Sequence, residues 1–469
     1  MIFPTIQFAI FFVVVLTASW LLKPYPRRWK LFMLSASYFF YGAWDWRFLG
    51  LLAFTTVVDH SVGGAIHRTE DPKRRRALLI LGVVVSLGVV AFFKYYDFFA
   101  SSLINLLRPL GIDLPLPILN IILPVGISFF TFQSLSYTID IYRRKLEPVP
   151  LLDFAVFVSF FPHLVAGPIV RGSEFLPQLK EKHDPRRVQG AAAFGLIAAG
   201  LFKKVVVANT LATSIVDPMF ASPQNFSGLE VLTGIYAYAV QIFADFSGYT
   251  DIAIGLALLL GFRFPQNFDR PYTATSLQDF WRRWHMTLSR FLRDYLYVPL
   301  GGNRNGRAAT YRNLMLTMVI GGLWHGAAWT FVLWGALHGV GLSIERWWGE
   351  MRGDAKSDSL GGRVARRLLT FHVVCLGWVL FRSDSVATAG TVLGRLADWG
   401  PVPSVTPLVV VLIAGSLATQ YLPPDRRLKL RVAFSRLRPA AMAAILGGLL
   451  LVIDALGPEG VAPFIYFQF

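Results

Sequence analysis

Residues 313–346 read "NLMLTMVIGGLWHGAAWTFVLWGALHGVGLSIER", an apolar stretch that ends at Glu345 and Arg346. A helix needs roughly 20 apolar residues to cross a bilayer, so this stretch of about 32 is too long for one upright span. Gly321, Gly322 and Gly326 bracket His325 within it. The stretch therefore predicts two helices, or one helix interrupted beside His325, at membrane depth.

The rest of the chain has the same character. Of its 469 residues, 54% are hydrophobic and only 16% are charged, and the mean hydropathy is +0.51. This composition is far more apolar than that of soluble domains and indicates a membrane protein. Further runs of spanning length, with no soluble-looking block between them, are 2–22, 77–100, 190–212, 228–262, 364–382, 403–421 and 440–456. We predict one all-α polytopic membrane domain over 1–469, with about 11 transmembrane helices and additional re-entrant and interfacial helices.

The first apolar run lacks a preceding basic region and a cleavage site, so we expect a first membrane helix and not a removable signal peptide. The single cysteine, Cys375, excludes an internal disulfide and a Cys-based metal site. Because it lies in an apolar run, we expect it to pack as a small buried hydrophobe.

The formal charge of +17 comes from short basic clusters beside apolar runs, such as "KPYPRRWK" (23–30), "DPKRRR" (71–76) and "DPRR" (184–187). Clusters of this kind are typical of cytoplasmic loops near anionic lipid and do not indicate nucleic-acid binding. Placing them inside puts the N-terminus and 101–117 outside. Both ends of 151–171, "LLDFAVFVSFFPHLVAGPIVR", then lie on the cytoplasmic side, which predicts a re-entrant hairpin with a structural or gating role for His163.

Residues 263–305 mix aromatic and cationic residues with apolar ones. Ser276 and Asp279 form a capping-box-like start, which predicts a helix over 277–297 that lies in or near the membrane interface. An aromatic and aliphatic stripe recurs along it: Phe280, Trp284, Leu288, Phe291 and Tyr295. His285 lies between the two faces. It is either a hydrogen-bonded ring at headgroup level or, if it points toward another unusual group, part of a site.

Histidine is the strongest candidate for chemistry. A neutral histidine accepts a proton near pH 7 at the lowest cost among buried groups, so we expect His325 to act as a general base, unless it only bridges helices by a hydrogen bond. The glycines around it should leave room for a reactant, and the neighbouring tryptophans supply bulk. On an unbroken helix His338 would lie about 140° away, which favours a packing role.

Asp245, Tyr249 and Asp251 occur in "FADFSGYTD", with Tyr249 four residues after Asp245 and so on the same helical face. Buried carboxylates indicate either a proton relay or a structural anchor to a neighbouring helix. No metal site is predicted, because no further ligand stands at suitable spacing. Phosphate-loop and nucleophile-elbow motifs are missing from the sequence, so any catalysis is expected within the membrane.

Five strings resemble the membrane-bound O-acyltransferase family, in particular the branch that acetylates alginate and related exopolysaccharides. They are "HLVAGPIVR" (163–171), "DFSGYTDIAIGLALLLGFRFPQNFDRPY" (245–272), "FWRRWHMTLSRFLRDYLYVPLGGNR" (280–304), "YRNLMLTMVIGGLWHGAAWTFVLWGALHG" (311–339) and "FIYFQF" (464–469). They follow the family's order from mid-chain to the last residue.

The resemblance implies a ring of helices around a central funnel, in which a cytoplasmic donor reaches an essential histidine. His325 in "LWHG" matches that histidine, and His285 in "RRWHMTLS" matches a second polar position that other branches fill with Asn or Asp. A direct proton-transfer role for His285 thus stays open. Residues expected to line the funnel or contact substrates are Asn267, Tyr272, Arg282, Arg283, Trp284, Trp324 and Asp245.

By resemblance, the donor is acetyl-CoA, no cofactor is bound, and the acetyl group passes across the cell inner membrane to a periplasmic or extracellular acetyltransferase partner. Membrane lipid surrounds the protein. The "FIYFQF" terminus either packs into the helix ring or meets the partner. Two alternatives are acylation of peptidoglycan, cellulose or teichoic acid, and a proton-coupled transporter or flippase, although the sequence shows no inverted repeat.

Overall fold

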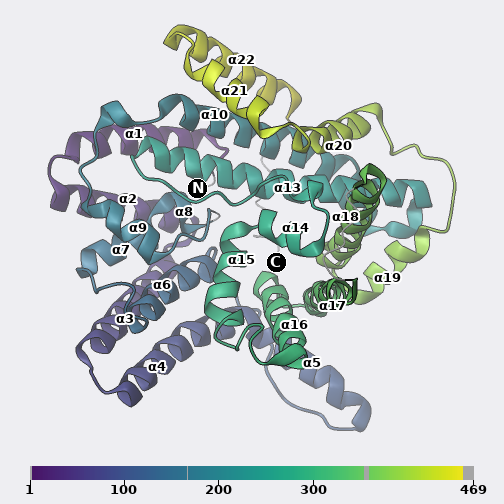
Figure 1. Cartoon of the computed structure of the whole chain (residues 1–469), viewed down its shortest axis with the longest axis horizontal. Helices are drawn as coiled ribbons and strands as arrows, with labels where there is room; N and C mark the ends of the chain where they lie inside the picture. Colours follow the sequence, from purple (N-terminus) through teal and green to yellow (C-terminus); the bar gives the residue numbers. More distant parts are fainter. Residues whose placement is uncertain (1–2, 166, 353–358, 458–469) are drawn as a thin grey trace. The chain divides into compact units, whose positions relative to one another are not determined.

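The computed structural model describes residues 3–165, 167–352 and 359–457, and in these ranges every regular element is a helix (Figure 1). Six helical segments of the described chain are long and apolar enough to cross a membrane: Pro26–Arg68, Pro72–Leu110, Gly190–Ala221, Gly228–Leu259, Leu360–Arg382 and Pro439–Leu456. The chain is thus an all-α, multi-pass membrane protein, as predicted. The ring, the funnel and the number of about 11 spans stay predictions. The "FIYFQF" terminus lies outside the described residues.

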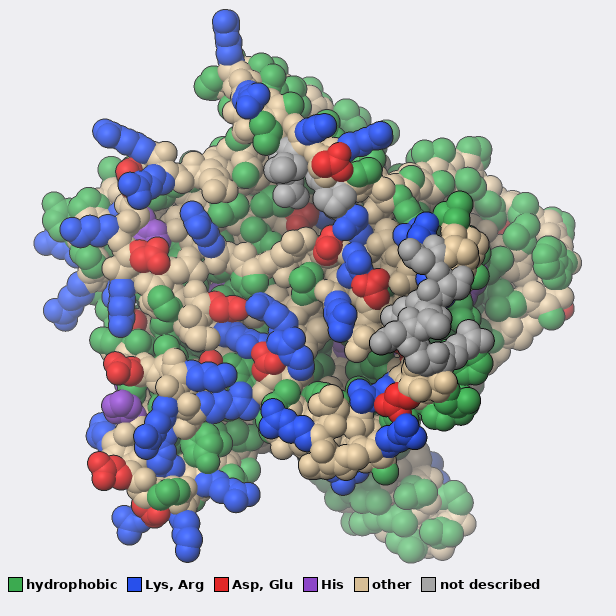
Figure 2. Space-filling model, in the orientation of Figure 1, with side chains coloured by type: hydrophobic (Ala, Val, Ile, Leu, Met, Phe, Trp, Pro, Cys, Tyr) green, Lys and Arg blue, Asp and Glu red, His purple; other side chains and the backbone are tan. Residues whose placement is uncertain are grey.

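Large apolar side chains stand exposed on these segments and on the shorter apolar helices Ile6–Leu22 and Pro407–Gln420, for example Leu451, Leu21 and Val411, at 72%, 72% and 65%. Figure 2 shows one face on which such hydrophobic side chains lie among many Lys and Arg and fewer acidic side chains. Exposed apolar surface of this extent is unfavourable in water and suits contact with lipid.

The contacts divide the chain into two compact units, each described by itself: Met1–Gln189 with Leu256–Phe264, and Gly190–Gly255 with Pro265–Phe469. The first unit contains helices α1 (Ile6–Leu22), α2 (Pro26–Asp45), α3 (Leu49–Arg68), α4 (Pro72–Val90), α5 (Tyr96–Leu107), α6 (Ile127–Tyr142), α7 (Leu151–Ser159), α8 (Phe161–Leu164) and α9 (Gly172–Phe175).

A buried carboxylate joins three helices of the first unit. Asp59 of α3 accepts hydrogen bonds from Ser86 of α4 at 3.0 Å and from Thr138 of α6 at 3.4 Å. Within a membrane, where helices gain little from hydrophobic burial against each other, such polar contacts between helices help to hold the bundle together.

The segment predicted to form a re-entrant hairpin folds into short buried helices, and its re-entry into the membrane stays a prediction. α7 ends before Phe160, whose extended ψ of 107° interrupts the helix, and α8 has Pro162 in its first turn. Neither α7 nor α8 is long enough to cross a bilayer. His163 Nε2 donates to the Phe157 carbonyl oxygen at 2.8 Å, which supports the structural role predicted for this histidine.

The second unit contains α10 (Gly190–Leu201), α11 (Asn209–Leu211), α12 (Asp217–Ala221), most of α13 (Gly228–Leu259), α14 (Leu277–Arg283), α15 (Met286–Leu292), α16 (Gly306–His325), α17 (Trp329–Arg352), α18 (Leu360–Arg382), α19 (Val386–Arg395), α20 (Pro407–Gln420), α21 (Pro424–Ser435) and α22 (Pro439–Leu456).

Asp245 of α13 serves as an anchor. It forms a buried ion pair with Lys204, which lies in the π-helical turn Phe202–Ala208 after α10. Asp251 pairs with the adjacent Lys203 at 2.5 Å. Of the two roles predicted for Asp245, the contacts support the structural anchor to a neighbouring helix, because an uncompensated charge at this depth would be costly.

The stretch 313–346 folds into two helices that meet beside His325, as predicted: α16 ends at His325 and α17 begins at Trp329. Glycines allow the two helices to touch. A Cβ on Gly322 would lie 2.2 Å from the Phe331 carbonyl oxygen, and one on Gly326 would lie 2.0 Å from the Phe331 ring. The expectation that these glycines leave room for a reactant is wrong, because α17 fills the space.

Candidate active site

His285 lies at a break between α14 and α15, so the prediction of one helix over 277–297 is wrong. Its backbone is left-handed, with φ 41° and ψ 54°, a conformation that costs a non-glycine residue about 1–3 kcal/mol. Asn267 provides the compensation. Its carbonyl oxygen accepts the Met286 N–H at 2.9 Å, and its side-chain Oδ1 accepts the Thr287 N–H at 3.1 Å.

Asn267 also determines which nitrogen of His285 carries the proton. Because Asn267 Oδ1 accepts the Thr287 backbone N–H, that atom is the amide oxygen and not the nitrogen. His285 Nδ1 lies 3.1 Å from the same oxygen and must donate to it. A neutral His285 therefore presents a lone pair at Nε2, and no described residue forms a hydrogen bond to Nε2. The His285 ring can therefore accept a proton at Nε2.

His325 lies beside His285. The centroids of the two rings are 6.4 Å apart, and both rings are buried. Trp324 contacts both, with centroid distances of 5.0 Å to His325 and 5.8 Å to His285. The alternative of a lone histidine at headgroup level is not supported, because His285 lies next to the other unusual group. Two residues 40 positions apart in the sequence, 325 − 285, share one site.

Aromatic side chains enclose this pair. His325 makes edge-to-face contacts with Trp334 and Phe381, each at 5.1 Å, and His285 makes one with Phe246 at 4.6 Å. Such packing excludes water from the two rings, which strengthens electrostatic interactions at the site.

His338 belongs to the next layer. Trp334 separates it from His325, with its ring 4.9 Å from His338, and the Phe280 ring stacks on His338 at 6.3 Å and 11°. The predicted angle of about 140° does not apply, because α16 and α17 are separate helices. Neither ring nitrogen of His338 has a hydrogen-bond partner among the described residues, and its contacts support the predicted packing role.

The other predicted site residues divide into three groups. Trp284 and Tyr272 are buried in the aromatic layer: Trp284 stacks on Phe280 at 5.6 Å, and the Tyr272 hydroxyl donates to the Ala239 carbonyl oxygen. Arg282 is exposed, and Arg283 pairs with Asp279 at 2.7 Å. Asp245 contacts Lys204 as described above. Contact of any of these with substrate stays a prediction.

Sequence reasoning did not identify the residues that support the site. Thr287 donates its hydroxyl to Asn267 Oδ1 at 2.9 Å, and Asn267 Nδ2 donates to Thr250 at 3.4 Å. Phe246 and Phe381, which contact the two histidines, were also not predicted. No local signal in the sequence links Asn267 to Thr287, because the two residues lie 20 positions apart.

Comparison with known proteins identifies the family of this chain. The model of the membrane-bound O-acyltransferase family matches residues 83–372. The probable alginate O-acetylase AlgI of Azotobacter vinelandii is 42% identical over 407 residues, covering 85% of this chain and 79% of that protein. The peptidoglycan O-acetyltransferase of Helicobacter pylori is 40% identical over 391 residues, covering 78% and 73%.

A teichoic acid D-alanyltransferase of Streptococcus thermophilus is more distant, at 30% identity over 240 residues, or 48% of this chain and 57% of that protein. The family match spans α14 to α17, which carry both site histidines, and favours an enzyme over a transporter. The chain therefore belongs to the membrane-bound O-acyltransferase family.

Proposed function

We propose that this acyltransferase takes an acetyl group from acetyl-CoA on the cytoplasmic side and passes it across the cell inner membrane for O-acetylation of an exopolysaccharide such as alginate. The observation that carries the proposal is the buried pair of His285 and His325, with ring centroids 6.4 Å apart. The similarity to probable alginate O-acetylases at about 40% identity supports the polymer class.

In the simpler mechanism, His325 acts as general base. It removes the proton from the acceptor hydroxyl, the oxygen attacks the thioester carbonyl carbon, and the carbon–sulfur bond breaks as the thiolate takes the proton back from His325. In the alternative, a ring nitrogen of His325 attacks the thioester carbonyl carbon and the carbon–sulfur bond breaks, which releases the thiolate. The acceptor hydroxyl then attacks the acetyl carbon, and the bond between that carbon and His325 breaks. Only in this second route is His285 Nε2 the acceptor of the hydroxyl proton, which then passes to the thiolate.

The two routes differ in one intermediate. With donor alone, the nucleophilic route leaves an acetyl group on His325, detectable by mass spectrometry of the purified protein after a rapid quench. Turnover without any adduct would exclude that route and leave the general-base mechanism.

The receiving partner is proposed to be a periplasmic or extracellular acetyltransferase that modifies the polymer. A second candidate acceptor is peptidoglycan, because the Helicobacter pylori peptidoglycan O-acetyltransferase is 40% identical to this chain. Ester-bound acetate, measured separately in the exopolysaccharide and peptidoglycan of a deletion strain, distinguishes the two polymers.

The test of the function is complementation of that deletion strain. Wild-type protein and the His67→Ala variant, which alters an exposed histidine at the end of α3, should restore polymer acetate. His325→Ala should not restore it, although the variant is present in the membrane at the wild-type level. Equal acetate from His325→Ala and wild type would refute the assignment of the site.

A further inference from the structure

A polar pocket of about 280 Å³ lies in the second unit, apart from the two site histidines. Arg270 and Asp279 line it from the loop before α14 and from α14, Arg367 from α18, and Gln420 and Tyr421 from the end of α20. Arg283 of α14 also lines it. Four segments that are far apart in the sequence thus bring three arginines and one acidic residue to one cavity.

Two of the arginines have carboxylate partners, and the third has none. Arg283 pairs with Asp279 at 2.7 Å, and Arg270 pairs with Asp269 at 3.1 Å. Among the described residues, no carboxylate pairs with Arg367, and its Nε is buried without an acceptor. The Arg367 guanidinium lies over the Tyr421 ring at 5.6 Å, which holds the charge at the pocket.

Gln420 adds a second buried donor. Its Oε1 accepts the Tyr272 backbone N–H at 3.0 Å, which identifies the other amide atom, Nε2, as the donor. Gln420 is only 3% exposed, and Nε2 has no acceptor among the described residues. A buried N–H without an acceptor is unfavourable, so its presence in the pocket that Arg367 also lines points to an anionic ligand.

We propose that this pocket binds a phosphate or diphosphate group. Guanidinium groups bind phosphate oxygens in a bidentate manner, and Gln420 Nε2 would donate to a further oxygen. One possible source of the phosphate is the acyl donor. Its phosphates would then lie beside the segment that carries His285, because Arg283 lines the pocket and lies only two residues before His285. The Arg283 carbonyl oxygen accepts the Asp269 N–H at 2.9 Å, which ties this segment to the loop before α14. This assignment to the donor rests on the proposed function. A phospholipid headgroup offers the same chemistry.

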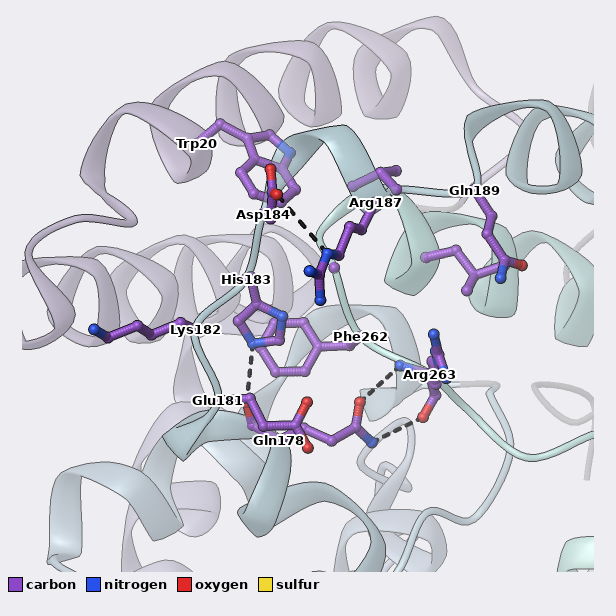
Figure 3. A pocket seen from close by; sticks show the side chains of 13 residues that line it. Trp20, Gln178, Glu181, Lys182, His183, Asp184, Arg187, Gln189, Phe262 and Arg263 are labelled. Carbon is purple, nitrogen blue, oxygen red and sulfur yellow. Dashed lines mark hydrogen bonds and ion pairs between the residues drawn. The ribbon is translucent and has the colours of Figure 1, made fainter.

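A pocket of about 340 Å³ in the first unit provides the contrast (Figure 3). Acidic residues there accompany the cations: Arg187 lies 3.9 Å from Asp184, and the two side chains are 88% and 45% exposed. The Gln178 side chain is satisfied by the backbone of Arg263, at 2.8 and 3.0 Å. None of the described residues that line this pocket has a buried donor without an acceptor. Arg187→Gln is therefore a matched control for the loss of one positive charge.

Binding is tested on the purified full chain in phosphatidylcholine nanodiscs, with desulfo-CoA and inorganic pyrophosphate as probes in isothermal titration calorimetry. Gln420→Glu keeps the acceptor for Tyr272 but replaces the donor by a negative charge, and Arg367→Gln removes the unpaired cation. Each should raise the Kd for the probes at least about 10-fold, as expected for a lost charge-assisted hydrogen bond. Arg187→Gln should leave it unchanged. If Gln420→Glu fails to fold, the Kd values of Arg367→Gln test the proposal.

Native mass spectrometry of protein from phosphatidylglycerol nanodiscs distinguishes the sources. If the wild type retains that lipid but does not bind desulfo-CoA, and the pocket variants lose the lipid, the pocket binds a lipid headgroup. This result also supports a phosphate pocket. Wild type that binds no phosphate probe and retains no lipid would overturn the proposal. So would equal binding by wild type and all three variants.

Acetyl transfer, measured on the same preparations, separates this proposal from the proposed function. If acetyl transfer requires His325 but the pocket variants have unchanged Kd values, the phosphate pocket is refuted and the proposed function stands. Phosphate binding without any acetyl transfer refutes the proposed function alone.

Discussion

At the scale of single residues, Asn267 decides what His285 can do. Its amide oxygen accepts from His285 Nδ1, from the Thr287 N–H and from the Thr287 hydroxyl. The histidine is thereby held in a left-handed backbone conformation and in the tautomer with a lone pair at Nε2. The funnel-lining role expected of Asn267 stays a prediction, and its contacts support a positioning role.

Asn267→Ala should lower acetyl transfer at least about 10-fold, because His285 loses both its orientation and its preferred tautomer. Buried donors left without an acceptor should also destabilise the protein by about 2–3 kcal/mol. The measurements are radiolabelled acetyl transfer and thermal unfolding in detergent. Gln266→Ala, at an exposed neighbouring position, is the control. Wild-type activity of Asn267→Ala would contradict the role of Asn267.

His338→Phe should retain at least about half of the activity and unfold at the same or a higher temperature. A buried polar group without a partner costs about 1–3 kcal/mol, and phenylalanine removes it while keeping a ring between Phe280 and Trp334. The same two assays apply. A stably folded variant with activity reduced more than about 10-fold would show that His338 takes part in proton transfer.

At the scale of elements, the two helix predictions near the site had opposite outcomes. The break beside His325 was correctly predicted, because glycines and an excessive apolar length are properties of the local sequence. The break at His285 was missed. Its flanking residues have helical periodicity, and the bonds that hold the break come from Asn267, 18 positions before His285.

The close contact of α16 and α17 gives an element-scale prediction. Gly322→Ala should destabilise the protein by about 1–3 kcal/mol and lower activity, since the new methyl group would push against the Phe331 carbonyl and displace His325. Gly349→Ala, on α17 with open space around the added Cβ, should be neutral or slightly stabilising. Equal unfolding temperatures for the two variants would contradict the close packing.

At the scale of the whole molecule, the hydrophobic runs correctly predicted a multi-pass membrane protein. The sidedness of its loops stays a prediction from the basic clusters, and it can be measured. Cys375 is buried, so the wild-type chain should react little with a maleimide. Asp113→Cys and Lys182→Cys place thiols at exposed loop positions that the positive-inside rule assigns to opposite sides.

A membrane-impermeant maleimide should label Asp113→Cys in spheroplasts and Lys182→Cys only after permeabilisation. Labelling is read by the mass shift of the purified protein. The reverse pattern would invert the proposed topology, and with it the side from which the donor enters.

The sequence by itself determined that this chain is a helical membrane protein with a helix break beside His325. It could do so because the free energy of moving apolar residues into lipid adds up along consecutive residues, and because the effect of glycine on a helix is local. Only the tertiary structure decided that His285 faces His325, that α17 fills the space over the glycines, and that Arg367 and Gln420 share a pocket. These features depend on contacts between residues distant in the sequence, and no local periodicity encodes such contacts.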